Sequence, residues 1–257
     1  RAVALSEVST TADALRAFEQ AYALMRDARG LSSTATLTCA VAVSSMHVSR
    51  EEYDEAAAVL DEALGAARTS LAPQAYVTGR LLEVRTLLEY QRGAFEASVE
   101  AASEAVEILA QRRGPQHPAT ARVQIRHGMA LTAAGHPERA LTVLNTAIVS
   151  LETAADETES LGEAWTALSE AKRHVSDLRG AVRDARRAIE LLEGVDGSNG
   201  GALGDAYHQL GLALDASGAQ ASSVRDALSR AVSEFEASAA EGYAHTAVLE
   251  ALRTRLE

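Results

Sequence analysis

Residues 121–134 read ARVQIRHGMALTAA, residues 135–138 read GHPE, and residues 139–152 read RALTVLNTAIVSLE. On both sides of GHPE the apolar residues recur at helical spacing, first as Ile125, Met129 and Leu131 and then as Leu141, Leu144 and Ile148. Gly135 suits the left-handed conformation that ends a helix, and Pro137 suits the first turn of the next one. The stretch therefore predicts two antiparallel amphipathic helices joined by a short turn.

The same pattern extends over nearly the whole chain with an almost fixed period. Small residues that align with Ala140 are spaced by 42, 42, 42, 41 and 42 residues, at Ala14, Ala56, Ser98, Ala140, Ala181 and Ser223. A second series of small residues consists of Ala21, Ala63, Ala105, Ala147 and Ala188. A repeat of this length predicts a tandem array in which each helix pair buries its apolar face against the next pair.

The turns recur in the same frame. Glycines align at Gly93, Gly135 and Gly218, and Ser9, Glu51 and Ser176 occupy the equivalent positions. No segment shows sustained period-two alternation, so no strands are expected. The acidic stretch 155–162 and the glycine-rich stretch 194–201 are expected to be solvated loops between repeats.

Two stretches, 165–191 and 207–218, resemble tetratricopeptide repeats (TPRs). Trp165 and Tyr207 match the large residue of the first helix in that motif, and Leu168-Ser169 and Leu210-Gly211 match its leucine–small pair. The second-helix positions are matched by Ala181, Ala185 and Ala188. The 42-residue period resembles the kinesin-light-chain-like variety, and GPQHPAT at 114–120 matches the loop that introduces such repeats.

The resemblance implies an all-α fold, a right-handed α-α superhelix of antiparallel helix pairs that forms a single TPR array over residues 1–257. Complete repeats are expected at 37–78, 79–120, 121–161, 162–203 and 204–245. Residues 1–36 should hold the tail of one first helix and an entire second helix, and residues 246–257 the start of another first helix. Neither end resembles a polar cap, which suggests a segment of a longer array.

The composition narrows the possible partners. The formal net charge is -12, with 36 acidic and 24 basic residues, and such a surface repels nucleic-acid phosphates. No apolar run approaches the roughly 20 residues that span a bilayer. With Cys39 as the single cysteine, no intrachain disulfide can form, which fits a reducing cytoplasm. We expect a cytoplasmic protein that binds neither nucleic acid directly nor membranes.

The sequence contains none of the common catalytic or cofactor motifs. No Gly-Lys-Ser/Thr phosphate loop, HExxH pair or Cys/His metal cluster occurs in the sequence. His117 and His136 are expected in turn or capping roles, His127 in a partly buried packing position, and Cys39 as a buried small apolar residue. The expectation is a noncatalytic chain with no cofactor and no metal.

The resemblance also implies that first helices line a concave groove in which a protein or peptide binds. The candidate groove residues are Arg80, Glu83, Tyr90, Arg122, Arg126, Met129, Glu163, Glu170, Arg173 and His208. Arginines lie toward the middle of this series and carboxylates toward its C-terminal half, so a peptide with an acidic end and a basic end would complement it. The asparagines that hold peptides in the better-known grooves have no counterpart at these positions.

Three functions remain open at this point. The first is a noncatalytic scaffold or sensor module that belongs to a larger bacterial signalling or regulatory protein. The second is an oligomerisation element that stacks end to end through its terminal helices. The third is a regulatory array attached to a kinase, an NTPase switch or a protease domain outside this segment.

Overall fold

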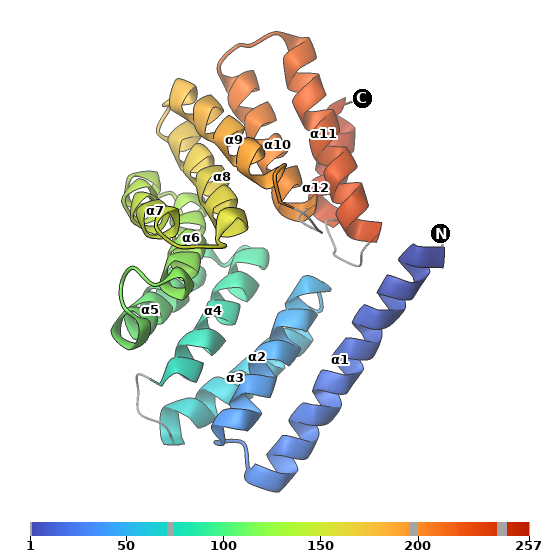
Figure 1. Cartoon of the computed structure of the whole chain (residues 1–257), viewed down its shortest axis with the longest axis vertical. Coiled ribbons are helices and arrows are strands. Elements are labelled where there is room, and N and C mark those ends of the chain that lie inside the picture. Colours follow the sequence, from blue (N-terminus) through green and yellow to red (C-terminus); the bar gives the residue numbers. More distant parts are fainter. Residues whose placement is uncertain (1, 71–74, 196–199, 241–245, 257) are drawn as a thin grey trace. The chain divides into compact units, whose positions relative to one another are not determined.

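The computed structural model describes residues 2–70, 75–195, 200–240 and 246–256, all of them in helices or in the connections between helices (Figure 1). The chain divides into two compact units, residues 1–130 and residues 131–257. The expectation of an all-α fold without strands is confirmed for the described residues.

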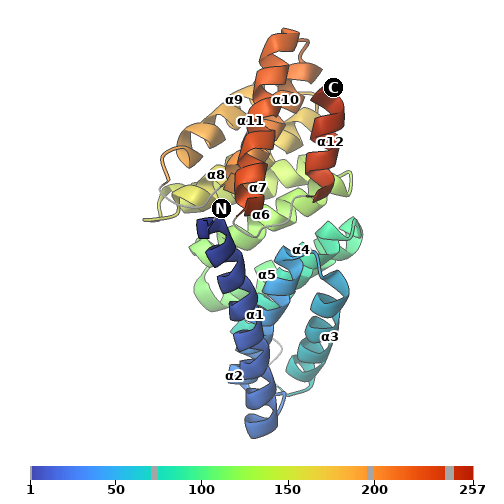
Figure 2. The same ribbon diagram turned by 90° about the vertical axis from the view of Figure 1, so that its right-hand side faces the viewer.

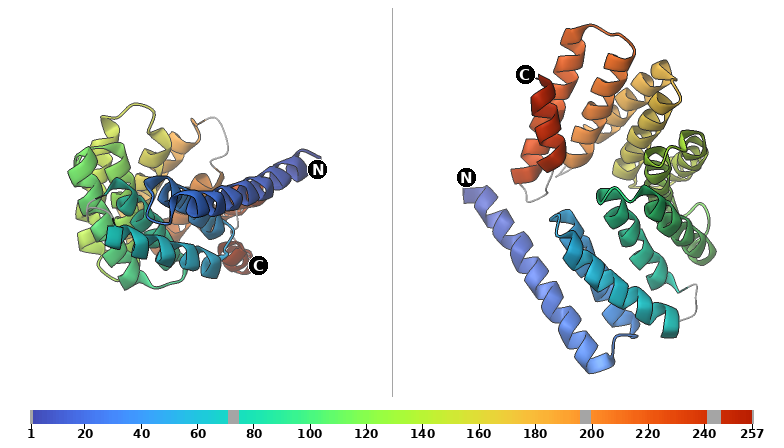
Figure 3. Two further views of the ribbon diagram at one scale, coloured as in Figure 1. Left: turned by 90° about the horizontal axis from the view of Figure 1, so that it is seen from below. Right: turned by 180° about the vertical axis from the view of Figure 1, so that it is seen from behind.

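Unit 1 contains a long first helix, two complete helix pairs and most of α6, which crosses the division. Its helices are α1 (Ala2–Arg29), α2 (Thr34–Ser49), α3 (Tyr53–Ser70), α4 (Tyr76–Gln91), α5 (Phe95–Arg113) and α6 (Pro118–Ala133). The helices α2 and α3 form one pair and α4 and α5 the next, and α4 also packs against both members of the preceding pair. Figure 3 shows α1 at the outer edge of this unit.

Unit 2 continues the same arrangement. Its helices are α7 (Pro137–Glu152), α8 (Thr158–His174), α9 (Leu178–Leu192), α10 (Gly200–Ala216), α11 (Ala221–Ala240) and α12 (Thr246–Leu256). The helices pair as α8 with α9 and α10 with α11, and α10 packs against both α8 and α9. Figure 2 shows α12 alongside α11, against which it packs.

Small residues set the spacing within each pair. The alanines of the second helices at Ala56, Ala63, Ala105, Ala140, Ala147, Ala181 and Ala188 are all fully buried. The first helices contribute glycines at the same interfaces: a Cβ added at Gly162 would lie 2.6 Å from Leu192 Cγ, and one added at Gly211 would lie 2.3 Å from Leu228 Cδ2. Because no room is left for these Cβ atoms, the helices of a pair pack closely through small residues, as the periodicity predicts.

The loop between repeats has a recurring hydrogen bond. In GPQHPAT the Thr120 hydroxyl donates to the Gly114 carbonyl oxygen at 2.9 Å, and His117 Nδ1 accepts from the Ala119 N–H at 3.1 Å. The Thr36 hydroxyl donates to the Gly30 carbonyl at the same distance, 2.9 Å, in the loop before α2. The capping role expected for His117 is confirmed, and a buried threonine fixes both of these loops.

The turns within the pairs follow the sequence frame closely. Gly93, Gly135 and Gly218 all have positive φ, and so do two non-glycine residues in the equivalent positions, Glu51 (φ 60°) and Ser176 (φ 64°). A side chain in this conformation is strained, because Cβ approaches the following carbonyl oxygen. Alignment with the glycines therefore predicted the backbone conformation of Glu51 and Ser176.

Replacing either residue by glycine should stabilise the protein. We expect Glu51→Gly and Ser176→Gly each to raise the free energy of unfolding by about 1 kcal/mol, because the left-handed backbone loses its steric penalty. Urea denaturation followed by circular dichroism measures the change. The opposite substitution, Gly93→Ala, should destabilise by about the same amount, and an unchanged stability in all three variants would contradict the argument.

Several sequence expectations need correction. The turn expected at Ser9 is absent, since α1 continues through it as one helix from Ala2 to Arg29. The alignment of Ser223 with Ala181 is wrong by one residue: Ser223 is exposed, whereas the following Val224 is half-buried. The reason is one additional residue between Gly218 and the start of α11. The acidic stretch 155–162 is only partly loop, because α8 begins at Thr158.

The structure agrees with some of the expectations for single histidine and cysteine residues and differs from others. His127 is half-buried, as expected, and Cys39 is half-buried where full burial was expected. His136 precedes α7 as its N-cap residue without a capping hydrogen bond from its side chain. The centre of the glycine-rich stretch, residues 196–199, lies outside the described residues.

One inward-facing position of the first helices differs in polarity from repeat to repeat. It is occupied by His47, Glu89, Leu131, Lys172 and Leu214. Each polar side chain in this series lies next to an ionisable partner. His47 Nδ1 lies 2.7 Å from Glu52 Oε2, and Glu89 Oε1 lies 2.5 Å from Arg85 Nε. Lys172 Nζ lies 2.5 Å from Asp184 Oδ2. The leucines show that the fold does not require a charge here.

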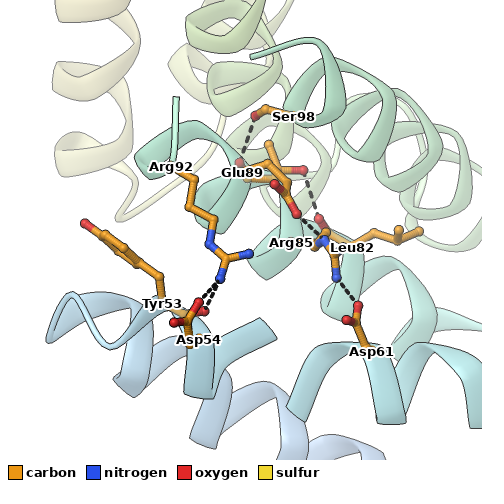
Figure 4. Close-up of polar contacts among 9 residues, drawn as sticks. Tyr53, Asp54, Asp61, Leu82, Arg85, Glu89, Arg92 and Ser98 are labelled. Carbon is orange, nitrogen blue, oxygen red and sulfur yellow. Dashed lines mark hydrogen bonds and ion pairs between the residues drawn. The ribbon is translucent and has the colours of Figure 1, made fainter. Parts of the chain in front are cut away.

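Arginines of α4 tie the two pairs of unit 1 together (Figure 4). The Arg85 guanidinium contacts Asp61 on α3, and Arg92 Nη2 lies 2.6 Å from the Asp54 carboxylate and donates to the Tyr53 carbonyl at 3.1 Å. These side chains are at least partly exposed, so each ion pair contributes little to stability. Arg85 and Arg92 are therefore paired with carboxylates of α3, in the preceding helix pair.

Candidate functional site

The ten candidate residues lie on first helices. Six of them lie in unit 1, on α4 (Arg80, Glu83 and Tyr90) and on α6 (Arg122, Arg126 and Met129). The other four lie in unit 2, on α8 (Glu163, Glu170 and Arg173) and on α10 (His208). Each of these helices also has a stripe that packs on neighbouring helices, so the candidates belong to its remaining surface.

In unit 1 the structure brings three candidates together around one carboxylate. Glu83 Oε2 lies 3.0 Å from Arg80 Nε on the same helix, and Glu83 Oε1 lies 3.9 Å from Arg126 Nε on α6. Neither contact has the alignment of a hydrogen bond, and both Nε atoms are buried without a hydrogen-bond partner. Two guanidinium groups thus face a single carboxylate, and the group of three, here called the arginine cluster, keeps a net positive charge.

The two apolar candidates of unit 1, Tyr90 and Met129, have different surroundings. The ring of Tyr90 stands edge-on to Phe95, with ring centroids 5.6 Å apart, beside the turn that joins α4 and α5. Met129 is half-buried on α6. The contacts described for these side chains do not join them to the arginine cluster, so their role in binding remains a prediction.

In unit 2 the candidates form a mainly acidic group on α8 and α10, which also includes Asp205. Burial of the carboxyl group and the negative charges of Glu163 and Glu170 together raise the pKa of Asp205 to about 7. Burial also raises the pKa of Glu170, against the opposing effect of Arg173, whose Nη2 lies 3.9 Å from Glu170 Oε1. We call Glu163, Glu170 and Asp205 the acidic cluster. It holds less negative charge near pH 7 than three ordinary carboxylates would.

His208 lies on the same helix as Asp205, one turn further on. Burial lowers the pKa of His208, and so do the positive charges of Arg173 and Arg255. Arg255 comes from α12 and contacts the Asp215 carboxylate on α10. Arg255 is not among the candidates predicted from the sequence, although its position gives a signal: alanine occupies it in the two preceding first helices, as the buried Ala171 and Ala213.

The acidic cluster predicts a pH-dependent stability. Folded Asp205 holds a proton up to about pH 7, whereas the unfolded chain releases it near pH 4. Stability should therefore fall as the pH rises from about 4 to 7. Although neighbouring side chains surround the Asp205 carboxyl group, part of the residue remains in contact with solvent, which screens its interactions. We therefore expect Asp205→Asn to be more stable than the wild type by only about 1 kcal/mol at pH 8 and equally stable at pH 4.

Urea denaturation at pH 4, 6 and 8 tests this difference, with Asp226→Asn on the exposed face of α11 as the control. A stability gain of Asp205→Asn that was the same at all three pH values would contradict the raised pKa.

Within the described residues, no group of three or more His, Cys, Asp or Glu side chains has the arrangement of a metal site. Among the described helices, none combines the length and the apolar character needed to cross a membrane.

Comparisons with known proteins give likenesses in structure only. No protein-family model matches the chain, and no curated protein matches it in sequence. BtubC (BKLC) from P. vanneervenii has a similar structure, with a TM-score of 0.64 and 16% identity, and the match covers 94% of this chain and 93% of BtubC. PlcR from Bacillus thuringiensis, solved in complex with the peptide PapR7 and DNA, has a TM-score of 0.66 and 15% identity over 86% of this chain and 75% of PlcR.

A third similar structure is a putative kinesin light chain from Podospora anserina with nearly identical TPR-like repeats. Its TM-score is 0.59 and its identity 16%, and the match covers 77% of this chain and 94% of the other. At these identities the likeness establishes the fold, and it agrees with the tandem helix pairs and the 42-residue period. The chain therefore has the fold of the tetratricopeptide-repeat proteins, built from the longer helix pairs of the kinesin-light-chain-like kind.

Proposed function

We propose that this chain is a noncatalytic module that binds a protein or peptide, as a scaffold or sensor within a cytoplasmic bacterial signalling or regulatory protein. Its fold supports the general role, because TPR-like arrays present extended surfaces to partners. PlcR, which shares the fold, is described in complex with a peptide. The surface that would bind lies on the first helices.

The observation that carries the proposal is the arginine cluster of unit 1. Arg80 and Arg126 share Glu83, whose side chain is only 13% exposed, while the arginine side chains remain 35% and 36% exposed. A planar guanidinium group binds carboxylates in a two-pronged geometry. An acidic side chain of a peptide would supply the second carboxylate that this cluster lacks. Arg122 lies one turn before Arg126 on α6 and adds positive charge to the same helix.

The acidic cluster of unit 2 has the opposite preference. Glu163, Glu170 and Asp205 come from two neighbouring first helices, and they would attract a lysine or arginine side chain of a ligand. Because Asp205 titrates near pH 7, binding of a basic peptide to this cluster should strengthen as the pH rises from 6 to 8. Each unit would thus select ligand residues of one charge.

Binding of the 257-residue chain to an array of random 15-residue peptides tests the proposal. We expect enrichment of peptides with acidic residues and a loss of their binding of at least tenfold in the variant Arg80→Ala/Arg126→Ala. The matched control is Arg186→Ala, which removes an exposed arginine from a second helix, α9. The proposal fails if the array yields no bound peptides, or if the double variant binds acidic peptides as well as the control does.

A second candidate function is self-association through the terminal helices, and the exposed apolar side chains of α1 favour it. Phe18 is 43% exposed and Leu24 is 69% exposed. Sedimentation velocity at several protein concentrations distinguishes the two functions, because a chain that remains monomeric at all concentrations is not an oligomerisation element.

A further inference from the structure

Two second helices, α9 in unit 2 and α5 in unit 1, carry rows of like charge on their exposed faces (Figure 1). The row on α9, here called the α9 row, consists of exposed arginines spaced four residues apart, Arg179, Arg183 and Arg187. The row on α5, here called the α5 row, consists of exposed glutamates with the same spacing, Glu96, Glu100 and Glu104. Because residues four apart lie on the same side of a helix, each row forms one charged stripe.

The two rows occupy the same positions of the repeat. Both helices begin at equivalent residues, since Phe95 of α5 aligns with Leu178 of α9. The fully buried residues of the two helices coincide in this frame, as Ser98, Ala102 and Ala105 on α5 and Ala181, Ala185 and Ala188 on α9. Each glutamate of the α5 row therefore aligns with one arginine of the α9 row, and the rows match in spacing and position but have opposite charge.

The fold does not require charges at these positions. In the second helix α7, two of the three equivalent residues are uncharged, Thr142 and Thr146. Like charges four residues apart repel each other and lower the stability of a helix. Both rows therefore destabilise their own helices, and charges of opposite sign from outside the helix would remove this repulsion.

Partners within the chain compensate the rows only in part. Arg183 and Arg187 contact carboxylates of their own helix, yet their side chains remain 70% and 53% exposed. Arg179 has no ion-pair partner among the described residues. On α5, Glu104 is paired with an arginine of α3 at 3.1 Å, whereas Glu100 has no such partner in the part of the chain that the structure describes. Each row therefore retains charge that a surface of opposite sign can neutralise.

We propose that the α9 row of one copy of this chain binds the α5 row of a second copy. The choice of a second copy rests on charge complementarity, because the chain itself carries a surface that matches the α9 row in spacing and is opposite in charge. The rows match in either relative direction of the two helices, since their spacing is symmetric. The contact joins two different surfaces and is therefore heterologous.

This contact goes beyond the proposed function, because it uses second helices and involves neither the arginine cluster, nor the acidic cluster, nor the terminal helices. Exposed ion pairs contribute little individually, so the association is weak. The net charge of -12 also repels two copies at long range. At an ionic strength of about 0.1 M this long-range repulsion is largely screened while contacts between adjacent side chains persist, whereas at about 1 M the contacts weaken as well.

Sedimentation equilibrium of the 257-residue chain over a range of concentrations tests the contact. We expect the weight-average mass to rise with protein concentration in about 0.1 M NaCl and to rise much less in about 1 M NaCl. The association constant should fall at least tenfold in Arg183→Glu/Arg187→Glu and in Glu100→Arg/Glu104→Arg. The second variant makes the chain less acidic, so an effect of net charge alone would strengthen its association instead.

A mixture of these two variants provides the rescue. The intact α9 row of Glu100→Arg/Glu104→Arg matches the intact α5 row of Arg183→Glu/Arg187→Glu, so the mixture should form dimers of unlike copies although neither variant associates alone. The matched control, Arg139→Glu/Arg225→Glu, adds the same negative charge at exposed positions of α7 and α11 outside the rows, and it should associate as the wild type does. Circular dichroism verifies that all variants are folded.

Three results would overturn the proposal. The first is a wild-type chain whose mass is that of a monomer at all concentrations. The second is a mixture of the two charge-reversed variants that does not associate. The third is an association that Phe18→Glu abolishes and the charge reversals leave unchanged, since the terminal helix α1 would then form the contact. Peptide binding by the arginine cluster is measured separately and does not depend on any of these results.

Discussion

Lys172→Leu is expected to lower the free energy of unfolding by about 3–5 kcal/mol, because it leaves a buried carboxylate without its main partner. Lys172 is the single lysine of the chain, and its Nζ lies 2.5 Å from Asp184 Oδ2 between α8 and α9. The Asp184 side chain is 2% exposed and the Lys172 side chain 18%. Arg183 Nε lies 3.5 Å from the other oxygen of Asp184, but its side chain is 70% exposed and compensates weakly.

The repeats supply the matched rescue. Leucine occupies the position of Lys172 in the flanking repeats, as Leu131 and Leu214, and valine occupies the position of Asp184 in two earlier repeats, as Val59 and Val143. The double variant Lys172→Leu/Asp184→Val should therefore recover to within about 1–2 kcal/mol of the wild type, or exceed it. Urea denaturation of the wild type, both single variants and the double variant gives the coupling energy. A double variant as unstable as Lys172→Leu would contradict this account.

Gly211→Ser is expected to destabilise the protein by about 2–3 kcal/mol through overpacking between α10 and α11. A Cβ at position 211 would lie 2.3 Å from Leu228 Cδ2 and 2.8 Å from Leu228 Cγ. Leu228 is 2% exposed and cannot turn toward solvent without uncovering the core that it shares with Phe235 and Leu252.

The repeats again indicate a compensating change. In two of the three pairs with a hydroxyl residue at this position, Ser169 and Thr86, the equivalent residue of the second helix is alanine, Ala185 or Ala102, whereas Ser44 in the first pair faces Leu60. The double variant Gly211→Ser/Leu228→Ala should therefore lose less free energy of unfolding than the two single variants lose in sum. Urea denaturation of the wild type, the two single variants and the double variant measures this difference. Additive effects of the two substitutions would mean that the clash is relieved elsewhere.

Much of the fold could be predicted from the sequence because the repeat supplies many copies of the same information. Aligned glycines predicted the positive φ of Glu51 and Ser176, which neither residue indicates alone. The one-residue shift in α11 was missed because Ala227 matches Ala185 in the unshifted alignment, whereas Ala231 matches Ala188 only in the shifted one. The turn at Ser9 was expected from spacing, but nothing in its local sequence ends a helix there.

The candidate site was less predictable. Helical periodicity assigned the candidate residues to first helices, and the structure confirms that placement. It could not indicate that Arg80 and Arg126 share Glu83, or that Glu163 and Glu170 shift the pKa of Asp205. These relations join side chains from different helices, and they depend on distances of a few ångströms that the spacing in the sequence does not contain.

The sequence by itself determined the helix pairs, their turns and the small residues through which they pack, because these features depend on local geometry repeated every 42 residues. Only the tertiary structure decided in which second helices the repeated apolar positions are buried. Phe18 and Leu60 occupy the same position of the repeat, yet Phe18 is 43% exposed and Leu60 is fully buried. The difference arises because burial is a property of the neighbouring helices, and among the described residues of unit 1 the helix α1 packs mainly against α2.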